Sequence, residues 1–329
     1  FPAYQLPVQY VVHLTLVFRS SAYYFLKSYP TCTITLKAKM TQSAKIITRF
    51  APSPSGDLHL GHAYSAKLSY DFSVQKGGDF ILRIEDIDHL RCKAEHEKSI
   101  LTDLRWLDLK WPTPIRRQSN HFTDYKAALD KLESMELLYP CFCTRRDIIN
   151  EIEESTRAPH MRPKFGPEGI IYPGTCRHLT TEEQQQKVDD GIPHALRFNT
   201  NKALGLLKAP LYWTDCKTGE QKATPELLGD VILARKDFPA SYHLCVVVDD
   251  HIQMINHVIR GQDLYYASHF HRLLQHLLKL NTPIYDHHPL LATRDGNRLA
   301  KRDKSITIKS IRESGIGPDQ IDELIKEYL

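Results

Sequence analysis

Apolar runs in this chain alternate with polar turns that are rich in proline and glycine. Residues 46–50 form a short apolar run, and the turn that follows holds two prolines and a glycine, which cannot continue a strand ladder. No proline or glycine interrupts residues 63–74. Apolar positions recur there at helical spacing: Leu60, Tyr64, Leu68 and Phe72. The pattern predicts a strand, a tight turn and a helix.

The same alternation continues along the chain and predicts an α/β fold. Strands are expected at 79–88, 195–199, 211–214 and 230–235, and residues from 230 onward look strand-rich. Helices are expected at 93–107, 123–137 and 264–279, from Thr181, and after Pro318.

Bulk composition places few limits on function. The chain has 329 residues, of which 25% are charged and 42% hydrophobic, as is ordinary for a globular protein. The net charge of +4 comes from residues 1–39, which hold four basic residues and no acidic one. The remaining residues carry equal numbers of both signs. Bulk charge is therefore no argument for nucleic-acid binding, and only a local patch would be.

Residues 1–39 are expected to be a disordered or non-native extension, because the first methionine is Met40. Their apolar run at 11–18 is broken by His13 and Thr15 and is too short to span a bilayer. The lack of acids together with Ser, Thr and Tyr also resembles a targeting segment, which is the alternative. No membrane partner is expected.

The turn after the first strand is the strongest candidate site. The start of a helix there presents free N–H groups and the positive end of a helix dipole, which favour phosphate. His59 and His62 flank Gly61, which allows close packing against the backbone. Glu85 lies in an acidic cluster at the end of the strand predicted at 79–88, where ligands bind in open α/β sheets.

Seven cysteines, an odd number, indicate a reducing compartment rather than a disulfide framework. Cys141, Cys143 and Cys176 lie in two short Pro-containing segments. Thiolates suit tetrahedral zinc, so the three are candidate ligands, although buried free cysteines are common.

The run Arg-Phe-Ala-Pro-Ser-Pro-Ser-Gly-x-Leu-His-Leu-Gly-His from Arg49 to His62 resembles the opening signature of class I aminoacyl-tRNA synthetases of the glutamyl/glutaminyl group. The resemblance extends over about 46–310 and implies a Rossmann-like catalytic domain. It implies a glutamate site formed by Arg49, Phe50, Ala51, Pro52, Ser53, Glu85, Tyr242 and Arg260. It implies an ATP site, used with Mg²⁺, formed by His59, Gly61, His62 and Lys301.

By the same resemblance the ligands of a structural zinc ion are Cys141, Cys143, Tyr172 and Cys176. The gap between Cys143 and Tyr172 is longer than expected for the family. His160 and His178 are therefore alternatives to Tyr172 as the fourth ligand.

About two dozen residues follow the Lys301 loop, too few for an anticodon-binding domain. Such a shortened chain resembles a branch of the family that activates L-glutamate with ATP, without tRNA, and attaches it to the queuosine base of tRNA(Asp). We expect a cytoplasmic monomer that acts on this tRNA. The alternatives are a truncated synthetase that charges a tRNA 3′ end, and a non-catalytic paralogue that binds tRNA or nucleotide.

The expected organisation has five parts. Residues 1–39 are the extension, 40–138 and 230–290 the two halves of the catalytic domain, 139–229 an inserted zinc-containing subdomain that binds the acceptor, and 291–329 the Lys301 loop and C-terminal helices.

Overall fold

The computed structural model describes residues 45–157, 165–292 and 307–329. The expected N-terminal extension, His160 and the Lys301 loop lie outside these residues.

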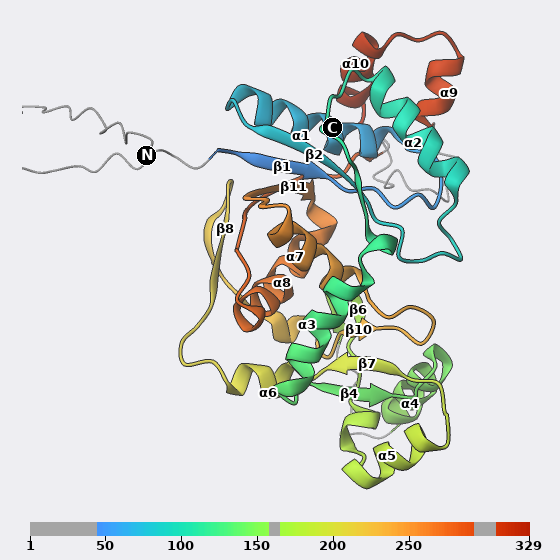
Figure 1. The fold of residues 1–329 in the computed structure, drawn as a ribbon, viewed down its shortest axis with the longest axis vertical. Coiled ribbons are helices and arrows are strands. Elements are labelled where there is room, and N and C mark those ends of the chain that lie inside the picture. Colours follow the sequence, from blue (N-terminus) through green and yellow to red (C-terminus); the bar gives the residue numbers. More distant parts are fainter. Residues whose placement is uncertain (1–44, 158–164, 293–306) are drawn as a thin grey trace, which may run out of the picture. The chain divides into compact units, whose positions relative to one another are not determined.

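The first strands form a small parallel sheet. β1 (Ile47–Phe50) pairs with β2 (Asp79–Ile84), and β2 pairs with β3 (Arg116–Arg117). Helix α1 (Leu60–Gln75) connects β1 to β2 (Figure 1), as the apolar pattern predicted. The strand–turn–helix unit at the start of the described chain is therefore confirmed.

A second group of strands continues the parallel arrangement. β11 (His257–Gly261) pairs with β12 (Ile284–His288), which is also parallel to β8 (Tyr212–Asp215). β9 (Gly219–Lys222) adds an antiparallel edge to β8. The group thus joins strands from two distant parts of the sequence.

Asn256 links the two groups of strands. Its backbone N–H donates to the carbonyl oxygen of Ile47 at 3.2 Å, and its side-chain oxygen accepts from the N–H of Ile47 at 2.8 Å. β1 consequently lies beside β11, and the parallel strands succeed one another as β3, β2, β1, β11 and β12. This is the α/β architecture expected from the sequence.

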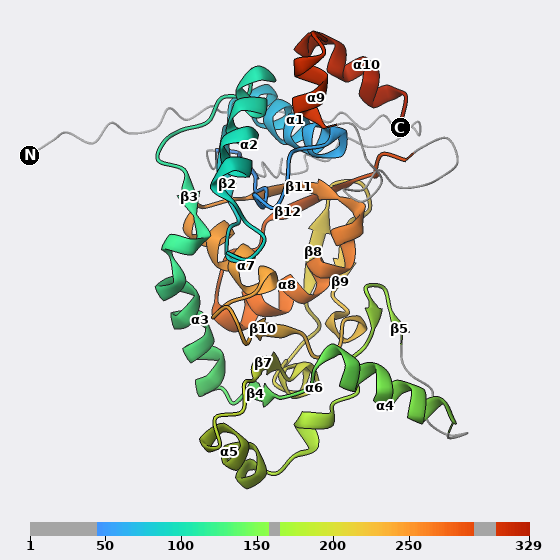
Figure 2. The ribbon, with the colours of Figure 1, turned by 90° about the vertical axis from the view of Figure 1, so that its right-hand side faces the viewer.

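Helices cover these strands in two separate cores. One core involves α1, α2 (Ala94–Trp106), α9 (Ile308–Glu313) and α10 (Ile321–Lys326). The other is built from α3 (Phe122–Ser134), α7 (Tyr242–Ile252) and α8 (Tyr265–Leu278), which lie together in Figure 2. α2, α3 and α8 begin and end within three residues of the predicted bounds.

Residues 242–252 differ from the expectation of a strand-rich half, because they form helix α7. The β-branched run Val246–Val248 is buried, as are Leu244 and Cys245, within the core shared with α3 and α8. Because most of helix α7 is buried, its sequence lacks the alternation of apolar and polar residues that marks an amphipathic helix. Packing in the core overrides the weak strand preference of valine.

Between α3 and α7 the chain forms a smaller antiparallel sheet, in the order β10 (Ile232–Ala234), β7 (Ala195–Phe198) and β4 (Leu138–Cys141). The other elements of this region are α4 (Arg145–Arg157), β5 (Phe165–Gly166), β6 (Gly169–Ile170), α5 (Thr181–Asp189) and α6 (Thr200–Gly205). Single 3₁₀ turns are η1 (Gln118–Asn120), η2 (Thr175–His178), η3 (Pro225–Leu227), η4 (Gln262–Leu264) and η5 (Pro318–Gln320).

The hairpin β8–β9 lies within the range predicted as an insertion, yet it pairs with β12 of the larger sheet. Strand β10, predicted in the second catalytic half, pairs with β7 of the smaller sheet. Each of the two sheets therefore contains strands from both sides of the predicted domain boundary at 229–230. No helix of the described residues is both long and apolar enough to cross a membrane.

Asp249 of α7 ties the two halves together from a fully buried position. It accepts from the Nε of Arg116 at 2.7 Å, from the side-chain amide of Gln118 at 2.8 Å and from the hydroxyl of Tyr125 at 2.9 Å. These partners precede it by more than 120 residues. A buried carboxylate with three donors is costly to disturb, because each donor loses its acceptor.

We expect Asp249→Asn to lower the free energy of unfolding by about 3–5 kcal/mol, because an amide replaces one acceptor oxygen with a donor. Urea unfolding at neutral pH measures the change. Asp130→Asn is the matched control, since Asp130 is exposed and pairs with Lys126 on the surface of α3. Its expected cost is below about 1 kcal/mol. Equal costs for the two variants would contradict this account of Asp249.

Candidate active site

The two histidines of the predicted nucleotide site lie at the start of α1. His59 caps the helix, and its Nδ1 accepts from the N–H of Gly61 at 3.1 Å. Nδ1 of His62 accepts in turn from the N–H of His59 at 3.2 Å, and the rings stack with centroids 3.7 Å apart. A Cβ at position 61 would lie 3.1 Å from the ring of His59. A side chain at position 61 would therefore crowd the ring of His59, which packs against the backbone here.

The segment between β1 and α1 is joined to the strand end that carries Glu85. The backbone N–H of Glu85 donates to the carbonyl of Pro52 at 3.0 Å. Phe50 is buried in the core, Ala51 is half-buried and Ser53 is exposed. The loop thus holds Glu85 close to the end of β1, as expected for neighbouring parallel strands.

Glu85 lies in a cluster of buried charges. Nη2 of Arg83 donates to its carboxylate at 3.3 Å, and Nη1 of Arg83 lies 2.9 Å from Asp250. Nε of Arg49 donates to the same oxygen of Asp250 at 3.2 Å. Burial opposes ionisation of Asp250, but the charges of Arg49 and Arg83 outweigh it and hold the pKa of this carboxyl below its usual range.

Burial raises the pKa of Glu85 to about 7, although the charges of Arg83 and Arg49 act in the opposite direction. Only 8% of this residue is exposed. A carboxyl that ionises near neutral pH in a dry site is ready to gain an ammonium partner, whose charge would favour its ionised form.

Arg260 differs from the other buried arginines in its partners. It is 4% exposed, and no carboxylate of the described residues lies within ion-pair distance. Its guanidinium donates instead to neutral acceptors: Ser268 Oγ at 2.5 Å, Nε2 of His287 at 3.3 Å, the Tyr242 hydroxyl at 3.3 Å and Nδ1 of His271 at 3.4 Å. A buried cation with this environment is poised for an anionic ligand.

The histidines around Arg260 are kept neutral. Burial, reinforced by the charge of Arg260, lowers the pKa of His243 and of His287 to about 4 and lowers that of His271 well below its usual value. Nδ1 of His243 lies 3.2 Å from Nε2 of His271, which continues the network away from Arg260. Neutral imidazoles supply acceptor nitrogens without repelling the guanidinium.

The structure thus brings Arg49, Glu85, Tyr242 and Arg260 into one buried region, where their charges act on each other. Sequence reasoning missed the residues that support Arg260: Asp215, His243, Ser268, His271 and His287. The one available signal was the position of His287 at the carboxyl end of a parallel strand, where ligand-binding residues gather. Lys301 lies outside the described residues.

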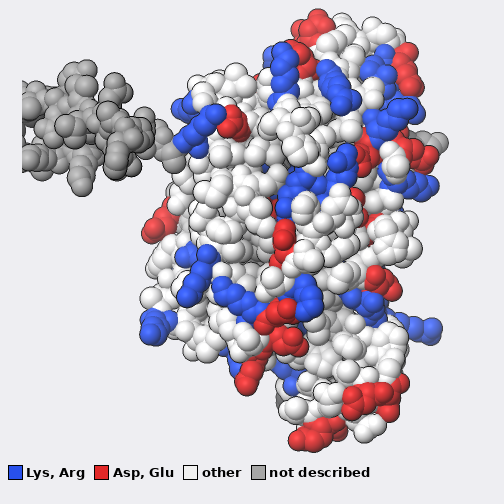
Figure 3. All heavy atoms as spheres, viewed as in Figure 1, with Lys and Arg blue, Asp and Glu red and all other residues white. Residues whose placement is uncertain are grey.

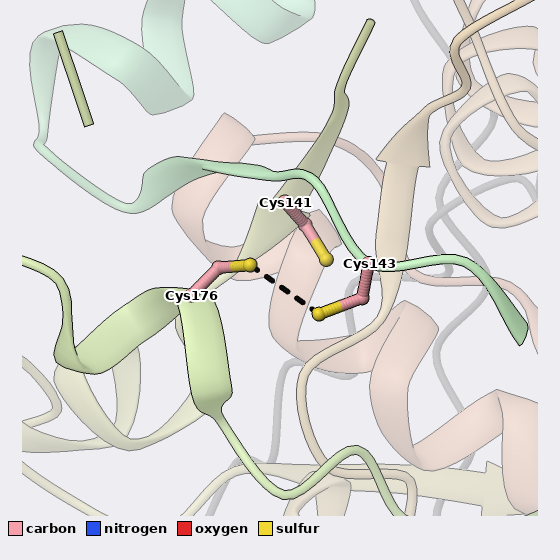
Figure 4. A group of neighbouring side chains, drawn as sticks. All are labelled: Cys141, Cys143 and Cys176. Atoms are coloured by element: carbon pink, nitrogen blue, oxygen red, sulfur yellow. Dashed lines mark hydrogen bonds between the residues drawn. The ribbon is translucent and has the colours of Figure 1, made fainter. Parts of the chain in front are cut away.

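The three cysteines of the candidate metal site converge from two segments (Figure 4). Cys141 ends β4, Cys143 follows it and Cys176 comes from η2; their sulfurs lie within 4.8 Å of one another. The hydroxyl oxygen of Tyr172 lies 3.5 Å from the sulfur of Cys141 and 3.4 Å from that of Cys143. Sulfur ligands around a tetrahedral zinc are about 3.8 Å apart, from Zn–S bonds of about 2.3 Å, so the spacing suits this metal.

Arg197 of β7 packs against this cluster. Its Nε donates to the sulfur of Cys141 at 3.1 Å, and its guanidinium lies 3.8 Å above the ring of Tyr172. Its Nη1 donates to the backbone carbonyl of Asp230 at 2.7 Å. The arginine thus fixes a candidate sulfur ligand and the tyrosine in one orientation relative to the small sheet.

Comparison with known proteins places the fold and this site in context. The family model described as tRNA synthetases class I (E and Q), catalytic domain, matches residues 45–326. The chain therefore belongs to this family, and the expected α/β synthetase catalytic domain is confirmed. A glutamate tRNA ligase of Elizabethkingia meningosepticum, solved with its amino acid, has a TM-score of 0.69 and 26% identity over 85% of this chain. The chain spans 60% of that structure.

Several curated relatives that match over most of their length are named glutamyl-Q tRNA(Asp) synthetase, among them the two that follow. The protein from Rhodobacter capsulatus is 42% identical over 286 residues, which are 85% of this chain and 99% of that protein. The one from Nocardia farcinica is 38% identical over 85% of this chain and 84% of its own. The glutamate--tRNA ligase of Aquifex aeolicus is 35% identical, but only 56% of it is matched. The resemblance to the shortened branch of the family is confirmed.

The raised pKa of Glu85 predicts how the stability of the protein depends on pH. Its pKa in the folded protein, about 7, exceeds the ordinary value of 4.5, so folding favours the protonated carboxyl. This contribution is complete below about pH 4.5 and is lost as the pH rises to about 7. We expect Glu85→Gln, which stays neutral, to gain about 3 kcal/mol of stability relative to wild type over this interval.

Urea unfolding of both proteins between about pH 4.5 and 8 measures the difference. Glu133→Gln, an exposed substitution on α3, is the control and should show a difference that is flat with pH. A flat difference for Glu85→Gln as well would refute the raised pKa.

Proposed function

We propose that this protein activates L-glutamate with ATP, without tRNA, and transfers the glutamyl group to the queuosine base of tRNA(Asp). The observation that carries the proposal is the buried guanidinium of Arg260, surrounded by neutral acceptors, in the same region as Glu85. An arginine with no carboxylate partner among the described residues suits a substrate carboxylate, and Glu85 suits the α-ammonium group. The names of the relatives that match over most of their length support the choice of acceptor.

In the first step an oxygen of the glutamate α-carboxylate attacks the α-phosphorus of ATP. A new P–O bond forms, the bond to the β-phosphate breaks, and pyrophosphate leaves with its electron pair. His59 and His62 lie at the start of α1, where the positive end of the helix dipole favours phosphate oxygens. Together with Lys301 they act by positioning and charge stabilisation. Mg²⁺ bound with ATP would neutralise charge on its phosphates.

In the second step a hydroxyl oxygen of the queuosine cyclopentenediol attacks the carbonyl carbon of glutamyl-adenylate. An ester bond forms, AMP leaves, and the hydroxyl proton is released. A base in an anticodon loop can be splayed out of its stack and brought to the adenylate, as is usual for recognition of single-stranded RNA. Basic and acidic side chains are interspersed on the face in Figure 3, so a local surface rather than overall charge would receive the RNA.

We further propose that Cys141, Cys143, Cys176 and Tyr172 hold a structural zinc ion. The donor set fits, because three sulfurs and one phenol oxygen lie within reach of a common centre. The Tyr172 hydroxyl, which lies close to two of the sulfurs, favours this residue as the fourth ligand. Among the described residues His178 forms no hydrogen bond with these sulfurs, and His160 lies outside the described residues. Zinc would hold β4 and η2 together within the predicted acceptor-binding subdomain, 139–229.

Cytoplasmic location and a monomeric state belong to the same proposal. The described cysteines are all free, including Cys143 and Cys176, whose sulfurs are 3.4 Å apart, which agrees with a reducing compartment.

Transfer of labelled glutamate tests the proposed function. We expect label on queuosine-containing tRNA(Asp), and none on the same tRNA without queuosine or on unmodified tRNA(Glu). Arg260→Gln should lower kcat/KM for glutamate at least about 100-fold, because a buried charge-assisted contact to the substrate is lost. Label on tRNA(Glu) would indicate a shortened synthetase that charges a 3′ end. ATP binding without pyrophosphate exchange for any amino acid would indicate a non-catalytic paralogue.

Metal analysis after dialysis tests the zinc proposal. We expect one zinc ion per wild-type chain, and its loss in Cys143→Ser, because a thiolate ligand is replaced by a poor one. Tyr172→Phe should retain zinc but release it faster to a chelator. Cys216→Ser, which changes an exposed cysteine elsewhere, is the control and should match wild type. Full zinc retention by Cys143→Ser would overturn the proposed ligand set.

A further inference from the structure

A buried chain of hydrogen bonds connects Asp215 to Arg260 through His287. Asp215, the last residue of β8, is 2% exposed, and its Oδ2 lies 2.8 Å from Nδ1 of His287 on β12. Nε2 of His287 then lies 3.3 Å from Nε of Arg260 and 3.0 Å from the hydroxyl oxygen of Ser268. The hairpin that carries Asp215 has so far no role in the proposed chemistry.

The donors in this chain fix the tautomer of His287. Although burial opposes it, the hydrogen bond from His287 and those from the backbone N–H groups of Lys217 and Thr218 lower the pKa of Asp215, so its oxygens only accept. Nδ1 of His287 must therefore carry the proton. Its pKa of about 4 keeps the ring neutral, which leaves Nε2 with a lone pair. That lone pair faces the N–H of Arg260, a group that only donates.

We infer that Asp215 is a positioning residue that holds His287 as the Nδ1-protonated tautomer and thereby aims the guanidinium of Arg260 at a carboxylate of the amino-acid substrate. This inference rests on the proposed function. The guanidinium is held from several sides: His287 receives Nε, Ser268 receives Nη2, and Nη1 faces Tyr242 and His271. If one of these acceptor atoms became a donor, the guanidinium plane of Arg260 that faces the substrate would rotate.

The two carboxylate oxygens of Asp215 have separate tasks, which makes the inference testable. Oδ1 accepts from the backbone N–H groups of Lys217 at 2.9 Å and Thr218 at 3.1 Å and so shapes the turn after β8. Oδ2 alone faces His287. An asparagine keeps an oxygen for the turn and places its amide nitrogen opposite Nδ1. The variant Asp215→Asn therefore preserves the turn and forces the proton of His287 onto Nε2, against Arg260.

The first measurement is the ¹⁵N NMR spectrum of the histidine rings in full-length protein without substrate. We expect His287 in wild type to be protonated at Nδ1, and in Asp215→Asn at Nε2. The second is glutamate-dependent pyrophosphate exchange. The KM for glutamate should rise about 10- to 100-fold with kcat within threefold, since a hydrogen bond to a charged group is lost from the binding site.

Asp286→Asn is the matched control, because Asp286 precedes His287 on the same strand and pairs with the half-exposed Lys217. Asp286→Asn should leave the tautomer of His287 unchanged and the KM for glutamate within twofold of the wild-type value. Asp215→Asn should have little further effect in a His287→Gln background, because the residue through which it acts has been replaced.

Three results would overturn the inference: a wild-type His287 protonated at Nε2, a tautomer change in Asp215→Asn without a change in KM, or an equally large effect of Asp215→Asn in the His287→Gln background. A different result would overturn the proposed function. In that case His287 of the wild-type protein has the expected tautomer, but pyrophosphate exchange occurs with other amino acids and not with glutamate. The substrate named here would then be wrong as well.

Discussion

Two adjacent carboxylates of α7, Asp249 and Asp250, compensate the positive charges that this fold buries. Asp249 pairs with Arg116, and Asp250 pairs with Arg83 and Arg49. Removing an ion from water costs several kcal/mol even after relaxation, so a buried arginine needs a partner of opposite charge. Arg260 has no carboxylate partner among the described residues, and these two carboxylates are engaged with other arginines. The geometry of α7 therefore determines which of the buried arginines have a carboxylate partner.

The same ion pairs explain why the candidate site exists only in the assembled fold. Arg49 lies near the end of β1 and Glu85 directly follows β2, whereas Asp250 lies 201 residues after Arg49 and Arg260 lies on β11. The parallel arrangement of β2, β1 and β11 brings their carboxyl ends to one edge, where such sheets bind ligands. Because Asp249 and Asp250 also hold these strands in place, changes that disturb their pairs affect stability and binding together.

The local pattern of apolar residues predicted most of the helices, but it did not predict the residues that form hydrogen bonds with Arg260. α1, α2 and α8 have uninterrupted runs with apolar residues at helical spacing, a signal contained within each segment. α7 was missed because it is buried on nearly all sides. The roles of Glu85, Tyr242 and Arg260 came from resemblance to a family. Asp215 and His287 are 72 residues apart, and among 17 histidines nothing local distinguishes one that accepts from a buried arginine.

The cysteine cluster shows how the predicted subdomain is tied to the core. Arg197 contacts Cys141 and Tyr172 and lies one residue before Phe198, which is fully buried against Phe270 of α8. Strand β7 thus runs from the cluster into the core that also contains α7. Loss of a metal would free the chain around Cys143 and Cys176 first, because backbone pairing still holds β4 to β7. The proposed structural ion would therefore order the segments around Cys143 and Cys176 and leave the buried region around Arg260 and Glu85 intact.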